Sequence, residues 1–138
     1  MKRREARELT LKILYRMDIK CEQINSILKD FWDSYSDIPP EIKEFAEKIA
    51  LGTEKNLNEI DNLISSVTLN WKLERMGYID RNILRMAACE IFFFDEIPSV
   101  VSINEAIEIA KIYGTEDSPK FINGILNKIK EKREKNKK

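Results

Sequence analysis

Apolar residues recur through most of the chain three and four positions apart, which is the spacing of one helix face. The pattern predicts six helices, over about residues 3–20, 24–35, 40–67, 79–94, 102–113 and 118–130. No segment of useful length alternates apolar and polar residues with a period of two, so we expect no sheet. The chain is therefore predicted to be all-α.

Turn and cap residues set the expected helix boundaries. Pro40 suits a first helical turn, and Ser102 with Glu105 fits a capping box at the start of the fifth helix. Gly114 is expected to end that helix in the left-handed conformation, and Ser118 is expected to begin the sixth. A turn region at about 70–77 predicts two three-helix subdomains, about 1–70 and 71–130, in one domain. Residues 131–138 have no apolar side chain and predict a disordered basic tail.

The bulk composition is that of one soluble helical domain. The chain has 138 residues, of which 43% are hydrophobic and 35% are charged, with only four glycines and four prolines. The formal net charge of zero hides two basic ends. Residues 1–20 hold seven basic against three acidic residues, and residues 119–138 hold eight against two. Such ends on an acidic body indicate either a polyanion partner or merely solvated termini, and charge alone leaves both open.

Little in the sequence supports catalysis. The chain has no histidine, which removes the commonest general base and metal ligand. Cys21 and Cys89 lie far apart and form no metal-binding pair, and no phosphate-binding glycine loop is present. We therefore predict no enzyme activity, no cofactor and no metal. Two separate thiols, no signal peptide and no apolar run of membrane-spanning length indicate a cytoplasmic protein without a membrane partner.

The first helix offers one candidate surface for nucleic acid. A helical projection places Arg3, Arg4 and Arg7 on one face opposite the apolar stripe, with Tyr15 on or next to that face. Guanidinium groups pair with phosphates, and an exposed ring can stack on an unpaired base. The alternative is that Tyr15 packs against another helix while the arginines are only solvated.

The start of the sixth helix offers a second candidate. Its free N–H groups and the charge of Lys120 favour a phosphate, and Phe121 lies at the flank of the apolar stripe. Phe121 therefore either stacks a base at the surface or edges the core.

Four segments resemble the NusB family of transcription antitermination factors. Asp80–Ala87 (DRNILRMA), followed by Glu90, is similar to the family's fourth helix, and Ser102–Lys111 (SINEAIEIAK) is similar to its fifth. Lys120–Leu126 (KFINGIL) resembles the sixth helix, and Arg7-Glu8 with Leu14-Tyr15 resembles the first. The resemblance implies two three-helix bundles that bind the boxA RNA of ribosomal-RNA leader transcripts. It also implies a complex with the ribosomal protein NusE, within an antitermination complex of RNA polymerase and other Nus factors.

The resemblance also implies site residues. The RNA contacts would be Arg3, Arg4, Arg7, Tyr15, Asp117, Lys120 and Phe121, and the contacts to NusE would be Asp80, Arg81 and Arg85.

The sequence departs from the family pattern and leaves alternatives. Glu5 interrupts the basic run, which implies weaker RNA affinity and more dependence on NusE, and no aromatic residue is obvious at the end of the third helix. A NusB-like domain also occurs in some ribosomal-RNA cytosine methyltransferases, but no methyltransferase motif is present here. The remaining alternative is a helical interaction module or homodimer without specific RNA binding.

Overall fold

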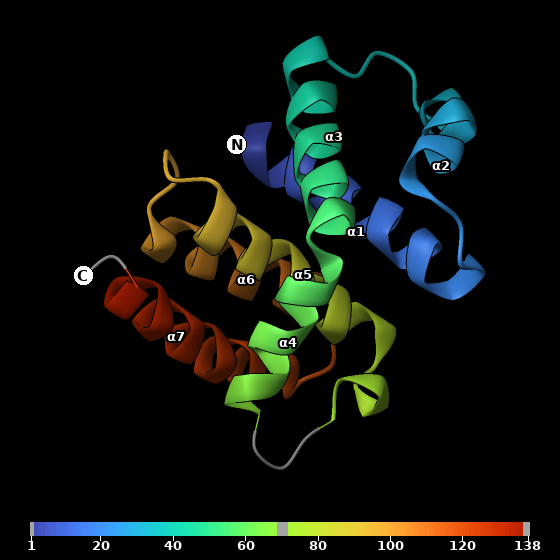
Figure 1. The fold of residues 1–138 in the computed structure, drawn as a ribbon. Coiled ribbons are helices and arrows are strands. Elements are labelled where there is room, and N and C mark those ends of the chain that lie inside the picture. Colours follow the sequence, from blue (N-terminus) through green and yellow to red (C-terminus); the bar gives the residue numbers. More distant parts are fainter. Residues whose placement is uncertain (1, 69–71, 137–138) are drawn as a thin grey trace.

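The computed structural model describes residues 2–68 and 72–136, and within these parts every regular element is a helix (Figure 1). This confirms the predicted all-α class. The elements are α1 (Lys2–Lys20), α2 (Ile24–Phe31), the 3₁₀ turn η1 (Trp32–Ser34), α3 (Pro40–Lys55), α4 (Leu57–Val67), the 3₁₀ turn η2 (Leu73–Arg75), α5 (Tyr78–Phe93), α6 (Ser99–Tyr113) and α7 (Ser118–Asn136).

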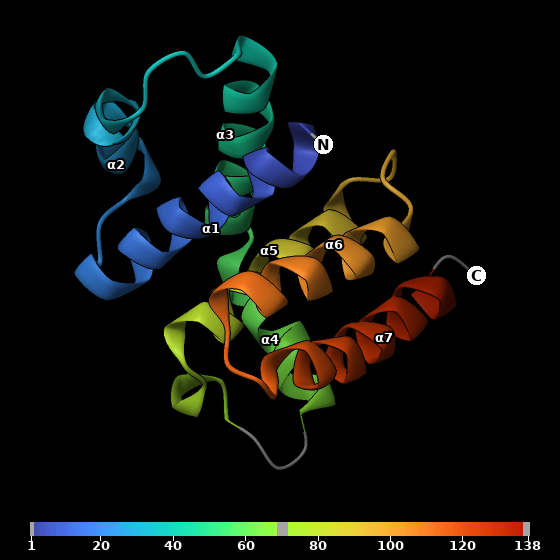
Figure 2. The same cartoon turned by 180° about the vertical axis from the view of Figure 1, so that it is seen from behind.

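Helix α5 forms the centre of the fold. All ten residues of Asn82–Ile91 are buried, so this stretch is covered on every side. A helix that is apolar around most of its circumference has to lie inside the fold, and α5 packs against α1, α3, α4, α6 and α7. Figures 1 and 2 show α1, α2 and α3 on one side of this central helix and α6 and α7 on the other. The helices α1 and α7, which carry candidate site residues, therefore both pack against α5.

The prediction of a single helix over residues 40–67 is wrong, because the helix is interrupted at Asn56 and forms α3 and α4. This residue has φ −108° and ψ 22°, and its amide Nδ2 donates to the Gly52 carbonyl at 2.9 Å. Asparagine competes in this way with the backbone hydrogen bonds of a helix. The break lets α4 turn away from α3 and pack on α5 and α7. The division of the chain into subdomains near residue 70 stays a prediction.

Two predicted features of α6 are also wrong. The helix begins at Ser99, directly after Pro98, so Ser102 lies inside it and caps nothing; its hydroxyl donates to Glu90 Oε1 at 2.9 Å. Gly114 ends the helix with φ −91°, which is not the left-handed conformation. Glycine is required there by space instead, because a Cβ would lie 2.5 Å from the Ser118 hydroxyl oxygen.

The predicted disordered tail is wrong for residues 131–136, which continue α7. The side chain of Arg133 fixes these last turns, because it donates to the Ile91 carbonyl at 3.1 Å and pairs with Asp95. Sequence patterning missed this because the anchoring groups lie on α5 and in the loop that follows it. Residues 137–138 of the predicted tail lie outside the described residues.

The backbone of Cys21 adopts an unfavourable conformation whose cost can be tested. It follows the last residue of α1 with φ +54°, a left-handed conformation in which a Cβ is unfavourable. Cys21→Gly is therefore expected to raise the free energy of unfolding by about 0.5–1 kcal/mol in urea denaturation. Cys21→Ser is the control, because it removes the thiol and keeps the Cβ. Equal stability of the two variants would show that the conformation carries no cost.

Candidate nucleic-acid interface

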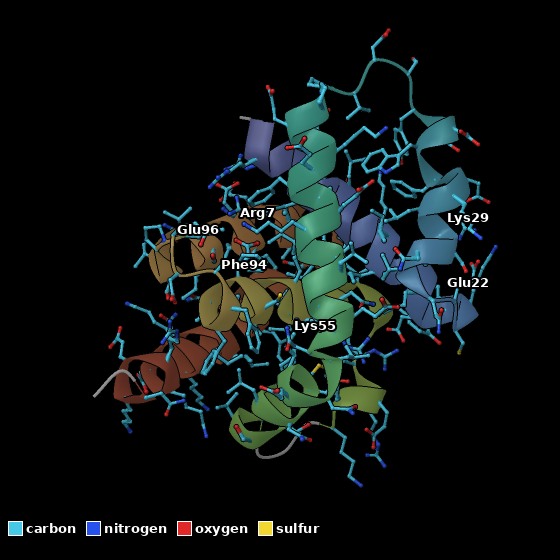
Figure 3. The ribbon with its side chains drawn as sticks, turned by 45° about the horizontal axis from the view of Figure 1, so that its top comes forward. Arg7, Glu22, Lys29, Lys55, Phe94 and Glu96 are labelled. Carbon is cyan, nitrogen blue, oxygen red and sulfur yellow. The ribbon has the colours of Figure 1, made fainter. Side chains whose placement is uncertain are left out.

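Arg7 does not lie on the surface of α1, so its predicted solvent-facing position is wrong. Only 2% of the residue is exposed. Its Nη2 donates to Glu90 Oε1 at 2.7 Å, and its Nε donates to both oxygens of the same carboxylate at 2.9 and 3.1 Å. Figure 3 shows Arg7 within the helical bundle, whereas Lys29 projects from its edge. The guanidinium therefore ties α1 to α5 and does not face a ligand.

Arg4 lies at the boundary between this buried pair and solvent. Its guanidinium makes two hydrogen bonds to Glu105 on α6, Nε to Oε1 at 2.9 Å and Nη2 to Oε2 at 2.8 Å. These bonds hold the pKa of the Glu105 carboxyl below its usual value, so the pair is ionised at neutral pH. The Arg4 side chain is still 37% exposed. Arg3 is exposed, and its guanidinium lies over the Phe45 ring at 4.7 Å.

Tyr15 lies on the surface near the other end of α1. It is 39% exposed, and its ring contacts the ring of Tyr78, the first residue of α5. The ring centroids are 6.0 Å apart and the planes meet at 75°, which is an edge-to-face pair. Tyr15 is therefore an exposed ring, as predicted, and also contacts another helix, as in the alternative.

The turn between α6 and α7 holds the remaining predicted RNA residues around a shallow pocket of about 290 Å³. Asp117 and Phe121 line it from the α7 side, and Asp80 lines it from α5. Lys120 is exposed beside them on the first turn of α7. The turn is fixed by buried Ser118, whose hydroxyl accepts a hydrogen bond from the Thr115 backbone N–H at 2.9 Å. The structure thus places Asp80, predicted to contact a protein, beside residues predicted to contact RNA.

Arg81 and Arg85 are engaged within the chain. Arg81 pairs with Asp18 of α1 at 2.8 Å, and buried Arg85 makes two 2.9 Å hydrogen bonds to Asp61 of α4. The predicted exposure of Arg85 to a partner is therefore wrong, because burial requires its charge to be paired internally. Both arginines join α5 to neighbouring helices and do not form a binding surface of their own.

No group of three histidine, cysteine, aspartate or glutamate side chains among the described residues could hold a metal ion. Burial raises the pKa of the Cys89 thiol to about 12, so this thiol is protonated at neutral pH. Cys21 is exposed. None of the helices in the described parts is long and apolar enough to cross a membrane.

Comparison with known proteins agrees with this picture. The family model described as the NusB family matches residues 4–131. The transcription antitermination protein NusB of Bacillus mycoides is 46% identical over 131 residues, covering 95% of this chain and 98% of that protein. The chain belongs to the NusB family. Membership confirms the resemblance found in the sequence and the prediction that the chain is not an enzyme, because the matched NusB relatives are transcription antitermination proteins.

Two solved NusB structures share the fold. NusB of T. maritima superposes with a TM-score of 0.85 at 42% identity, covering 94% of this chain and 90% of that one. A crystal structure of the antitermination factors NusB and NusE in complex with dsRNA matches with a TM-score of 0.87 at 26% identity. That match covers 95% of this chain and 97% of the solved chain. The helical arrangement seen here is thus the NusB arrangement.

Tyr78 is a surface residue of this NusB-family chain that was not predicted from the sequence. Tyr78 is 45% exposed and completes the ring pair with Tyr15, but the periodicity placed the helix start at residue 79. An aromatic residue directly after Gly77, at the first position of a helix, is the signal that could have found it.

Proposed function

We propose that this chain is a cytoplasmic transcription antitermination factor that binds boxA RNA of ribosomal-RNA leader transcripts together with NusE. The observation that carries the proposal is the pocket between the starts of α5 and α7, which Phe121 and Asp117 line together with Gly77. Tyr15 of α1 contacts Tyr78, the residue after Gly77, and exposed Lys120 precedes Phe121. Through this surface the chain would join the complex of RNA polymerase and other Nus factors. The relatives' role in antitermination supports the assignment.

Phosphate contacts in the proposal come from exposed cations. Arg3 and Lys120 lie on the surface, and Arg4 is half-exposed but shares its charge with Glu105. Arg7 supports α1 from inside and makes no RNA contact. Each contact to a single-stranded phosphate contributes only about −0.7 to the slope of log K against log salt concentration. A site with so small a number of cations should therefore show only a moderate salt dependence. We therefore expect weak RNA affinity that increases when NusE is present, as the interrupted basic run also implied.

Base contacts supply the sequence preference. The ring of Tyr15 and the partly exposed ring of Phe121 are surfaces on which unpaired bases can stack. The carboxylate of Asp117, beside Phe121 in the pocket, can accept a hydrogen bond from an exocyclic amino group of a base. Asp80 on the other wall is the residue through which NusE would reach the same pocket.

Phe121→Ala tests the proposed site directly. We expect the variant to bind a labelled boxA RNA about tenfold more weakly than the unmodified protein, because one base loses its stacking partner. Binding to a scrambled RNA should fall much less. The measurement is fluorescence anisotropy at two salt concentrations, with and without purified NusE.

Phe93→Ala is the matched control for Phe121→Ala. Phe93 is an exposed phenylalanine at the other end of α5 from Tyr78. The helical rise of about 1.5 Å per residue puts the two positions about 22 Å apart. The loss of Phe93 should therefore leave RNA binding unchanged. Equal losses for boxA and scrambled RNA would reduce Phe121 to a packing residue. No boxA preference in the unmodified protein, even with NusE, would favour the homodimer or interaction-module alternative.

A further inference from the structure

We propose that Tyr78 is a second base-stacking residue and forms with Tyr15 a two-ring platform for one unpaired nucleotide of the RNA. The inference rests on the proposed function, and it adds a binding position supplied by α5. The platform would hold a single-stranded base next to the pocket that contains Phe121.

The two rings are arranged as a corner. Tyr15 comes from the C-terminal part of α1 and Tyr78 from the first turn of α5, and their planes meet at 75° with centroids 6.0 Å apart. A base stacked parallel to one ring therefore lies nearly perpendicular to the other and can contact it edge to face. Both arrangements are favourable for aromatic rings. The two residues remain 39% and 45% exposed although their rings contact each other, so part of the ring pair faces solvent.

Tyr78 is held in place by a chain of charged contacts. The guanidinium of Arg81 lies over its ring, 4.9 Å from the centroid. Arg81 is itself fixed by Asp18, whose Oδ2 accepts from Arg81 Nε at 2.8 Å and from the Asn82 amide at 2.9 Å. Because Asp18 is on α1, the same contact fixes α1 relative to α5, and with it the position of Tyr15 relative to Tyr78. A pre-ordered ring pair loses little conformational freedom when a base binds.

The platform adjoins the pocket described above. Gly77, the residue directly before Tyr78, lines that pocket together with Asp117 and Phe121. The start of α5 thus carries pocket wall and platform ring on consecutive residues. In this proposal, one RNA strand places one base against Phe121 and a nearby base on the tyrosines.

Stacking on the two tyrosines should distinguish single-stranded RNA from duplex RNA, but it should not distinguish one base from another. Every base has a π-face, so stacking tolerates sequence changes but requires a base that is not already stacked in a duplex. The platform should therefore contribute to binding of single-stranded RNA and contribute nothing to binding of a perfect duplex. If Tyr78 instead contacted a phosphate, its contribution would not depend on an unpaired base and would not be lost with a duplex.

The test compares Tyr78→Ala with Tyr78→Phe, using anisotropy with single-stranded boxA RNA and copies that lack one base at each position in turn. We expect Tyr78→Ala to bind the intact strand about tenfold more weakly, while Tyr78→Phe, which keeps the ring, binds like the unmodified protein. At one position, removal of the base should weaken the unmodified protein by a similar factor and have no further effect on Tyr78→Ala. A perfect duplex of the same sequence should bind equally to all three.

Tyr78→Leu keeps apolar bulk at the helix start without a π-face, and it should behave like Tyr78→Ala. Unchanged affinity of Tyr78→Ala, or the same loss against every base-deleted RNA and the duplex, would overturn the platform. If Phe121→Ala still weakens boxA binding in that case, the proposed function stands and only the platform fails. If the unmodified protein has no boxA preference with NusE present, both fail.

Discussion

Arg7→Met is expected to lower the free energy of unfolding by about 3–5 kcal/mol, because it leaves the Glu90 carboxylate buried without a cation. Arg7 and Glu90 side chains are almost fully buried, 3% and 1% exposed, and joined by three hydrogen bonds. The other hydrogen bond to Glu90, from Ser102, cannot neutralise its charge. Equilibrium unfolding in urea, monitored by circular dichroism at 222 nm, measures the loss.

Two variants separate burial of the charge from loss of the side chain. Arg7→Met with Glu90→Met removes both charges and should be clearly more stable than Arg7→Met alone, because no unpaired charge is then buried. Arg4→Met breaks the pair with Glu105, which also has two hydrogen bonds but lies partly in solvent, and the loss should be much smaller. Similar losses for Arg4→Met and Arg7→Met would mean that burial does not set the energetics of this network.

The same pair shows why the sequence predicted one arginine wrongly. A helical projection of α1 records which residues share a face, and it placed buried Arg7 on the same face as exposed Arg3. It contains no information on Glu90, which lies 83 residues later and whose carboxylate is buried opposite Arg7. Arg85 was assigned to the partner surface through the family resemblance, which also carries no information on its pair with Asp61 of another helix. Charged residues that pair across helices have the appearance of surface residues in any single segment.

Local signals, in contrast, predicted most of the elements. The beginnings of α3 at Pro40 and of α7 at Ser118 follow from residue types that are favourable in the first turn. The break at Asn56 was missed because the apolar spacing continues across it, and the side-chain bond to Gly52 cannot be read from that spacing. For the candidate site, Tyr15 and Lys120 are exposed as expected. Phe121 is only partly exposed and packs against the core, which is the second of its two predicted positions. Tyr78 could be recognised only from the contact between α1 and α5.

Gly114→Ala is expected to destabilise the protein by about 2–3 kcal/mol, as overpacking in a fixed turn does. A Cβ at this position would lie 2.6 Å from Ser118 Cβ and 2.9 Å from the Ala110 carbonyl oxygen. Rotation of the Ser118 side chain could relieve its hydroxyl but neither of these contacts, so the backbone of the turn has to shift. Urea denaturation measures the loss of stability.

The control for Gly114→Ala is Gly124→Ala in the interior of α7, where a Cβ has no neighbour within 4 Å. It should stabilise the protein by about 0.5–1 kcal/mol, because alanine is the better helix former. Gly114 begins the turn that positions Lys120 and Phe121, so Gly114→Ala should also weaken boxA binding under conditions where the variant is still folded. Gly124→Ala should not. If Gly114→Ala loses stability but keeps full boxA affinity, the turn holds α6 and α7 together without positioning the RNA site.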